Sequence, residues 1–336
     1  MQLQSHPASA EARSDSPVAD APFFIVGCGR SGTTLLRVIL LGHSRLNISP
    51  ETHFIRGLVD DFPLRSTLLP EQVAAVVDVM VAHPRWRAMG MPADLFRDSA
   101  MALRQPLMAD VLNLVYQHHA REAGKVRSGD KTPDYVRYIP QLLEIYPDAK
   151  FIHLIRDGHD VAMSYATVGW GQAYQGERFE WSQAVRSGLT YRRAPFADRI
   201  LEVRYEDMVR DLEGSVRRIC AFLGETFEPE MLDWHSRIEL LFPGEDPNLH
   251  RKLYQPLMAD AVSTWRRKLS AVECFIMEAS LRRDLQAMNY DMRYSAPVWR
   301  PFLAAAGLVM HQLAPLLDRA IPALKRRKLL PRPLYI

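Results

Sequence analysis

Residues 27–34 (GCGRSGTT) combine glycines, an arginine and hydroxyl side chains in a pattern suited to holding a phosphate. Glycines allow positive φ angles and let the backbone approach a ligand closely. Successive backbone N–H groups then form a concave anion site, which the positive end of a following helix reinforces. The alternative is a glycine-rich turn that binds nothing. We expect the anion contacts to come from Gly29, Arg30, Ser31, Gly32, Thr33 and Thr34.

The same loop departs from the ATP-binding pattern G-x-x-x-x-G-K-[ST] at its lysine position, where this chain has Thr33. That lysine normally reaches the β- and γ-phosphates, so its loss argues against ATP hydrolysis or an ordinary kinase. Arg30 instead places a planar, permanently charged group inside the loop. This arrangement suits a ligand held through one 5′-phosphate from which a group leaves. No later apolar run ends in a metal-binding aspartate, so we expect no obligatory metal.

A second candidate anion site lies in residues 151–165 (FIHLIRDGHDVAMSY). Arg156 stands at the carboxyl end of an apolar run, where open α/β sheets bind ligands. Ser164 follows eight residues later, about two helical turns on, so the two side chains are expected to meet at one phosphate. Asp157 or Asp160 is expected to cap the intervening helix. The alternative is that Arg156 only pairs with a surface carboxylate.

The elements that position these residues alternate between strand and helix. Strands are predicted at 23–28, 151–155 and 201–205, a buried helix at 33–41, helical segments over 70–120 and a helix at about 211–223. Strand, glycine-rich turn and buried helix open a nucleotide-binding α/β fold. The sequence therefore predicts a P-loop nucleotide-binding fold whose central, mostly parallel sheet is flanked by helices.

Composition bounds the organisation of the 336-residue chain. A net charge of +3 is too small to argue for a nucleic-acid partner. Three dispersed cysteines form no metal-ligand spacing and no disulfide framework, which favours a reducing compartment and a cytoplasmic location. Residues 1–20 are expected to be a disordered lead, 21–294 one domain, and 295–336 an amphipathic, basic tail. This tail either packs on the domain or weakly contacts anionic lipid.

Residues 24–40 (FIVGCGRSGTTLLRVIL) resemble the 5′-phosphosulfate loop of sulfotransferases that use 3′-phosphoadenosine-5′-phosphosulfate (PAPS). The stretch RSGTTL is similar to the tyrosylprotein sulfotransferase branch and its bacterial relatives, whereas cytosolic members typically carry lysine at the place of Arg30. Residues 151–165 resemble the family's 3′-phosphate motif. The resemblance implies that Arg156 and Ser164 bind the 3′-phosphate of PAPS.

Later segments carry the resemblance further. Residues 204–207 (RYED) imply that Tyr205 lies near the adenine, and residues 263–266 (STWR) resemble the segment that closes over the nucleotide. The resemblance therefore adds Ser263, Trp265 and Arg266 to the nucleotide contacts. Two positions depart from the tyrosylprotein pattern, namely Val168 at an arginine position and Gln255 at a lysine position.

The resemblance also implies the catalytic groups. Lys131, in GDKTP at 129–133, would stabilise the bridging oxygen with help from Arg30. Glu51, in SPETHF at 49–54, would be the general base, and His53 is the second candidate for that role. The alternatives are a surface lysine and a residue that merely begins a helix. Residues 56–125 are expected to shape the acceptor cleft.

The predicted function is transfer of a sulfuryl group from PAPS to a hydroxyl of an unidentified acceptor, which leaves 3′-phosphoadenosine-5′-phosphate (PAP). The acceptor classes are small molecules, glycans or lipids, and peptide tyrosine. A P-loop nucleoside or small-molecule kinase is one alternative, and a non-catalytic PAP-binding protein is the other. The sequence leaves the oligomeric state open.

Overall fold

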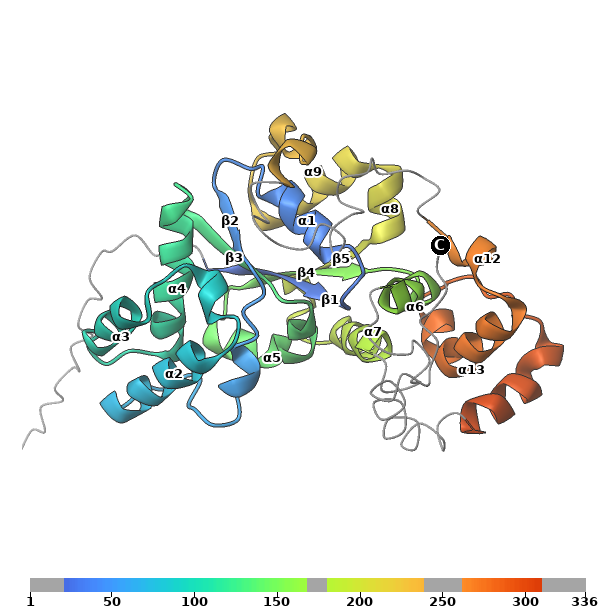
Figure 1. Cartoon of the computed structure of the whole chain (residues 1–336), viewed down its shortest axis with the longest axis horizontal. Coiled ribbons are helices and arrows are strands. Elements are labelled where there is room, and N and C mark those ends of the chain that lie inside the picture. The colour runs from blue at the N-terminus through green and yellow to red at the C-terminus, as the bar shows by residue number, and fades with distance from the viewer. Residues whose placement is uncertain (1–20, 168–179, 239–261, 310–336) are drawn as a thin grey trace, which may run out of the picture.

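The structure is a computed structural model that describes residues 21–167, 180–238 and 262–309 (Figure 1). Within them, five parallel strands form one sheet in the order β2-β3-β1-β4-β5. The strands are β1 (Phe23–Gly27), β2 (Leu46–Ser49), β3 (Arg127–Lys131), β4 (Lys150–Ile155) and β5 (Ile200–Arg204). The predicted α/β architecture with a parallel sheet is confirmed.

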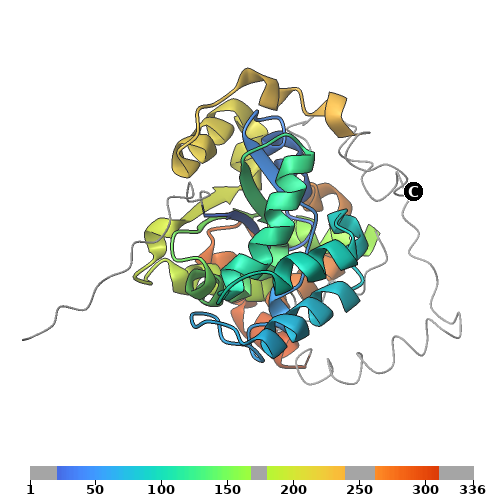
Figure 2. The same cartoon turned by 90° about the vertical axis from the view of Figure 1, so that its left-hand side faces the viewer.

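Helices cover both faces of this sheet (Figures 1 and 2). The α-helices are α1 (Thr33–Leu40), α2 (Pro70–Ala82), α3 (Ala93–Met101), α4 (Met108–Glu122), α5 (Ile139–Ile145), α6 (Gly158–Thr167), α7 (Glu180–Tyr191), α8 (Tyr205–Arg210), α9 (Leu212–Leu223), α12 (Trp265–Lys268) and α13 (Ala271–Ala287). Short 3₁₀ segments are η1 (Ile55–Gly57), η2 (Trp86–Met89), η3 (Pro133–Tyr138), η5 (Ala197–Arg199), η6 (Pro229–Leu232), η7 (His235–Arg237) and η10 (Pro297–Trp299).

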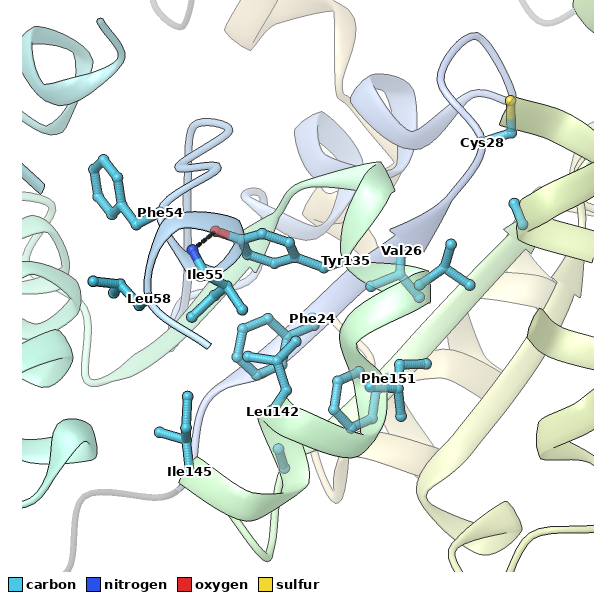
Figure 3. Close-up of a cluster of buried hydrophobic side chains, with 14 of the residues drawn as sticks. Phe24, Val26, Cys28, Phe54, Ile55, Leu58, Tyr135, Leu142, Ile145 and Phe151 are labelled. Carbon is cyan, nitrogen blue, oxygen red and sulfur yellow. Dashed lines mark hydrogen bonds between the residues drawn. The ribbon is translucent and has the colours of Figure 1, made fainter. Parts of the chain in front are cut away.

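The central strand β1 separates two hydrophobic cores. Phe24 and Val26 pack into one core with side chains from α2, α4, α5, α7 and α13. Phe23 and Ile25 point the other way, into a core formed with α1, α8 and α9. All four side chains are fully buried, because successive residues of a strand face opposite sides of a sheet that is covered on both faces. Figure 3 shows part of the first core, in which Phe24 and Phe151 stack.

Three strands and the first helix lie within one residue of their predicted bounds. The predicted strand end at Tyr205 is wrong by one residue, because Tyr205 begins α8. The helix predicted at 211–223 is α9, and Gly224 ends it with a φ of 84°. Two strands, β2 and β3, were not predicted from the sequence. The sequence of β3, RSGDK, has no apolar run, because this strand carries charged site residues into the sheet.

The two chain ends are described only in part. The predicted lead at 1–20 lies outside the described residues, as does the tail from 310 onward. The described part of the tail contains η10 and a helix over 300–309. Among the described residues, no helix is both long enough and apolar enough to span a membrane.

Candidate active site

Every candidate site residue outside the late segment 263–266 lies at or shortly beyond the carboxyl end of a strand, or in the helix that follows it. The loop 27–34 follows β1, Glu51 follows β2, Lys131 ends β3, Arg156 follows β4 and Tyr205 follows β5. Because all five strands are parallel, these ends meet at one edge of the sheet. Open α/β sheets bind ligands at this edge.

The glycine-rich loop adopts the conformation that an anion site requires. Gly32 has a φ of 97°, and a Cβ atom there would lie 2.6 Å from the Tyr205 ring. Gly32 also precedes α1 and offers no side-chain cap, so the first N–H groups of the helix are left for a ligand. The Ser31 side chain is fully buried, and its Oγ has no hydrogen-bond partner among the described residues. A bound phosphate oxygen would satisfy this hydroxyl.

The second candidate motif contacts this loop directly. Arg30 Nε donates to Ser164 Oγ at 3.2 Å, and Arg156 Nη1 donates to the carbonyl oxygen of Arg30 at 3.4 Å. The Arg156 guanidinium lies 4.3 Å from the centre of the Tyr205 ring. Arg156 is buried, and its neighbouring carboxylate, Asp160, is buried as well. The structure therefore brings the loop, Arg156, Ser164 and Tyr205 together.

Glu51 and Lys131 form an ion pair at this edge. Lys131 Nζ lies 2.5 Å from Glu51 Oε1 and 3.4 Å from the hydroxyl of Thr34, the last residue of the loop. Burial alone would raise the pKa of Glu51, but the Lys131 ammonium and a hydrogen bond from His53 outweigh it and hold the pKa well below its usual range. Burial lowers the pKa of Lys131, and Glu51 opposes that effect. Each charge thus favours the charged form of its partner.

His53 lies beside the candidate base. Its backbone has a φ of 56°, which is uncommon for a residue other than glycine. This turn brings His53 Nε2 to 3.1 Å from Glu51 Oε2. Arg85, just before η2, approaches the same oxygen at 3.8 Å. His53, the second candidate for the base, thus contacts the first candidate, Glu51.

The late segment 263–266 packs onto the second motif. The Trp265 indole is enclosed, and its Nε1 donates to Asp157 Oδ2 at 3.0 Å. The backbone N–H of Trp265 and the hydroxyl of Thr264 both donate to Asp160 Oδ1, at 2.9 and 2.6 Å. Arg266 is half-exposed and bonds to Asp291 at 2.6 Å. A nucleotide contact by Trp265 or Arg266 stays a prediction, as does one by Ser263, whose φ is 54°.

His159 extends this contact to α13. Its Nδ1 lies 2.8 Å from Asp157 Oδ1, its Nε2 lies 3.6 Å from Glu278 Oε1, and its ring stacks on Trp265 at 4.3 Å. Burial alone would lower the pKa of His159, but the two carboxylates outweigh it and raise the pKa to about 9. We call His159, Asp157, Glu278 and Trp265 the histidine clasp.

Sequence reasoning missed part of these arrangements. It treated Asp157 and Asp160 only as helix caps. Asp157 does accept the His159 N–H at 2.9 Å, as a cap would, yet it also holds Trp265. The signal was present, since RDGHD places charged groups directly after a buried strand. The positions Val168 and Gln255, noted as departures from a family pattern, lie outside the described residues.

Comparison with known proteins identifies the family. The model of the Sulfotransferase family matches residues 22–229, which is more than half of the chain. The chain belongs to the sulfotransferase family. This sulfotransferase is therefore an enzyme that transfers a sulfuryl group to an acceptor, and the predicted family and reaction class are confirmed.

Individual relatives of this sulfotransferase share about a quarter of its residues. A protein-tyrosine sulfotransferase A of Caenorhabditis elegans is 23% identical over 290 residues, which cover 82% of this chain and 69% of the relative. The omega-hydroxy-beta-dihydromenaquinone-9 sulfotransferase Stf3 of Mycobacterium bovis is 29% identical over 259 residues, which cover 62% of this chain and 64% of the relative. Among solved structures, the sulfotransferase domain of the Synechococcus PCC 7002 olefin synthase has a TM-score of 0.60 at 23% identity, and covers 84% of this chain and 100% of that domain. This last likeness supports the fold.

Proposed function

We propose that this sulfotransferase uses PAPS as its donor and releases PAP. The observation that carries the proposal is the contact between two candidate anion sites, through the bonds from Arg30 to Ser164 and from Arg156 to the Arg30 carbonyl. A donor with phosphates at both its 5′ and 3′ positions needs two such sites side by side. The unsatisfied Ser31 hydroxyl supports anion binding in the first of them.

Residues of the loop would hold the 5′-phosphosulfate through backbone N–H groups, Ser31 and the hydroxyls of Thr33 and Thr34. Arg156 and Ser164 would hold the 3′-phosphate, and Tyr205 would lie near the adenine. Ser263, Trp265 and Arg266 would close this side of the site. The bonds from the late segment to Asp157 and Asp160 support the closure, because they fix it against the helix that carries Ser164.

The donor supplies a sulfuryl group on a phosphate oxygen that becomes a good leaving group. Glu51 accepts the proton of the acceptor hydroxyl as that hydroxyl attacks sulfur. Lys131, assisted by Arg30, neutralises the charge that develops on the leaving oxygen. Transfer in line requires Glu51 and Lys131 on opposite sides of the reacting sulfur, so their ion pair must open when donor and acceptor bind.

Opening this pair changes the strength of the base. While Lys131 stays 2.5 Å away, the pKa of Glu51 is low and the carboxylate is a weak base. When Lys131 turns to the leaving oxygen, Glu51 loses the positive charge that lowers its pKa most. The base therefore becomes stronger only when the donor is in place.

The acceptor carries a hydroxyl and belongs to the small molecules, the glycans or lipids, or the tyrosine peptides. Residues 56–125, which include α2, α3 and α4, would shape its cleft. The stacked rings of His53 and His83, 6.3 Å apart, support this placement because His53 also contacts the base. The names of the worm and mycobacterial relatives fit a tyrosine and a lipid acceptor, respectively.

We also propose a domain organisation, a location and a membrane contact for the whole chain. One catalytic domain spans 21–294, and the reaction needs no metal and no nucleic acid. A cytoplasmic location is supported by the three free, buried cysteines. Weak membrane contact by the tail is supported by the exposed apolar residues Phe302, Leu308 and Val309.

One observation argues against a kinase, and another argues against a non-catalytic PAP-binding protein. A kinase would need the loop lysine, and Thr33 stands there, buried at the start of α1. A non-catalytic PAP-binding protein would have no reason to keep a charged Glu51 and Lys131 paired at the ligand-binding edge, because unneeded buried charges lower stability.

Replacement of the base tests the proposal. Glu51→Gln should lower PAP formation from PAPS by about 10²- to 10⁴-fold, while PAP affinity measured by calorimetry stays within a few-fold. Small phenols, glycans, lipid alcohols and tyrosine peptides serve as acceptors. The control is Glu144→Gln, which removes an exposed carboxylate paired with Arg65 and should change neither quantity. Unchanged PAP formation in Glu51→Gln would contradict the assignment of the base.

A further inference from the structure

A buried carboxylate lies next to Lys131 and has no role in the proposed transfer. Asp130 is fully buried in β3 and accepts hydrogen bonds only from hydroxyl groups among the described residues. Thr52 Oγ1 donates to Oδ2 at 2.6 Å, Thr132 Oγ1 donates to Oδ1 at 2.7 Å, and Tyr116 OH donates to Oδ2 at 3.0 Å. We call these residues, with Tyr135, the Asp130 cluster.

The cluster joins the two segments that carry the catalytic groups. Thr52 directly follows Glu51, and Thr132 directly follows Lys131. The backbone N–H of Thr52 also donates to Thr132 Oγ1 at 3.0 Å, so two hydrogen bonds cross between the segments here. Glu51 and Lys131 are therefore each followed directly by a threonine that is hydrogen-bonded to Asp130.

Tyr135 extends the cluster to the next turn of the chain. Its hydroxyl lies 2.7 Å from Thr52 Oγ1 and accepts the backbone N–H of Ile55 at 3.1 Å (Figure 3). Its ring packs edge-on against Phe24 in the core of the sheet. The segment 51–55 is thus attached at two backbone N–H groups to side chains that the sheet holds in place.

The charge of Asp130 costs stability. Burial raises its pKa to about 6, although the three hydroxyl donors oppose the shift. The folded state therefore binds a proton more tightly than the unfolded state, and stability falls as pH rises from the unfolded pKa to about 6. At neutral pH the carboxylate is ionised, so a functional reason for keeping it is needed.

Several other titratable groups lie around Asp130. Tyr116 and Tyr135 both have pKa values well above the usual value for tyrosine, because they are buried beside this carboxylate. The groups that interact with Asp130 electrostatically are Tyr116 from α4, Tyr135 from η3, Tyr146 after α5, His53 from the segment after β2, and Lys131 from its own strand. Asp130 helps to keep Lys131 charged.

We propose that Asp130 is a positioning residue for the transfer, which holds the Glu51 and Lys131 segments at a fixed separation through Thr52 and Thr132. The proposal rests on the proposed function for its catalytic consequence. An ionised carboxylate accepts these three hydroxyl bonds more strongly than a neutral carboxyl group, because both of its oxygens then carry negative charge. Protonation near pH 6 would therefore loosen the link, whereas Glu51 stays ionised at that pH.

Two amide groups report on the link without any acceptor substrate. The N–H groups of Thr52 and Ile55 are bonded to the Thr132 and Tyr135 side chains. Hydrogen exchange followed by mass spectrometry, on the protein without added nucleotide, measures their protection. In Asp130→Asn and in Thr52→Val, we expect exchange in residues 50–56 to rise by tenfold or more while the rest of the chain keeps its rates.

Stability and turnover complete the test. At pH 7.5, Asp130→Asn should melt no lower than the unchanged protein, because it removes a buried charge, yet form PAP from PAPS at least tenfold more slowly. The unchanged protein should lose turnover below about pH 6, and the variant should lack this step. The control is Asp134→Asn, three residues from Lys131, where a more exposed carboxylate pairs with Arg137; it should alter none of these quantities.

Two results would overturn the proposal. Unchanged exchange in residues 50–56 of both variants would mean that the cluster does not hold this segment. A lower melting temperature with faster exchange throughout the chain would make Asp130 an ordinary core residue. Absence of PAP formation by the unchanged protein would contradict the proposed function instead, and exchange would still decide the positioning role.

Discussion

The closest contact between candidate catalytic residues is also the one that restrains them. Lys131 neutralises Glu51 while the two are paired, so neither group is available to a substrate until the pair opens. Loss of one member of a buried ion pair lowers the stability of the fold, because the remaining charge has no partner. In the proposed mechanism, the residue pair couples the strength of Glu51 as a base to occupancy of the donor site.

Removal of Lys131 tests this coupling. Lys131→Met should lower PAP formation by about 10²- to 10³-fold, because the leaving oxygen loses its charge partner. The pKa of Glu51 should rise toward and above its usual value, since burial remains while the ammonium is gone. The pH profile of kcat/KM, which reports the free enzyme, measures this shift as an acid limb at higher pH. Both proteins carry Asp130→Asn in this experiment, because that change removes the step expected near pH 6 from Asp130. Identical profiles with and without Lys131 would argue against the coupling.

Gly32 allows a prediction about the phosphate loop. Gly32→Ala should weaken PAP binding by at least tenfold, because a Cβ there would meet the Tyr205 ring at 2.6 Å and φ is 97°. Gly90→Ala is the matched control, because φ is 70° there but no atom lies within 4 Å of an added Cβ. Calorimetric titration with PAP measures both variants. Equal affinities would show that contact with Tyr205 has no bearing on the site.

At the scale of elements, the histidine clasp fixes α12 and α13 against α6. Figure 1 shows α12 and α13 beside α6, and the clasp residues supply charged and aromatic contacts between them. Glu278 also accepts the backbone N–H groups of Arg293 and Tyr294, at 2.6 and 2.8 Å. The clasp thus connects the segment that carries Arg156 with residues 293 and 294, which follow α13.

The clasp predicts a dependence of stability on pH. The pKa of His159 is raised to about 9 in the folded state, so its contribution is complete below the ordinary histidine pKa of about 6.5 and is lost as pH rises through about 9. The loss is on the order of 3 kcal/mol, because one pKa unit corresponds to about 1.4 kcal/mol. In His159→Gln, the melting temperature measured between pH 6 and 10 should no longer fall as pH rises through about 9. The control is His235→Gln, which changes an exposed histidine and should keep this fall. The same fall in His159→Gln would assign it to another group.

The elements also mark how far sequence reasoning reached. Strands such as β1 and β4 are apolar because both faces are buried, and periodicity found them. In β3, Gly129 lies under the Phe23 ring and Asp130 and Lys131 are charged, so hydrophobicity gave no signal. The motif around Lys131 was recognised by resemblance alone. The partners of Asp130 and His159 come from distant segments, and one sequence does not reveal such contacts.

At the scale of the whole molecule, the parallel sheet concentrates function at one edge. Five strands in the order β2-β3-β1-β4-β5 bring the loop, both candidate catalytic residues and the second anion motif together, although they span residues 27 to 205. The described start of the tail lies beside α13 and carries the exposed apolar residues Phe302, Leu308 and Val309 (Figure 1). These residues precede the basic run KRRK at 325–328 in the sequence.

Weak membrane contact by this tail has a direct test. The intact chain should float with liposomes that contain anionic lipid, and flotation should fall with salt because screening weakens the basic run. Replacement of both Phe302 and Leu308 by serine should lower flotation at constant salt, because less apolar surface would enter the interface. A chain that ends at residue 294 and floats as well as the intact one would remove the tail from this role.

The donor is the central claim, and isothermal titration with PAP tests it most directly. The purified protein is titrated with PAP and, separately, with ATP, both in the presence of EDTA. We expect tight PAP binding, weak ATP binding and a loss of PAP affinity of at least tenfold in Arg156→Ala. Absence of PAP binding, together with ATP binding that requires Mg²⁺, would contradict it and assign the loop to a kinase-like site.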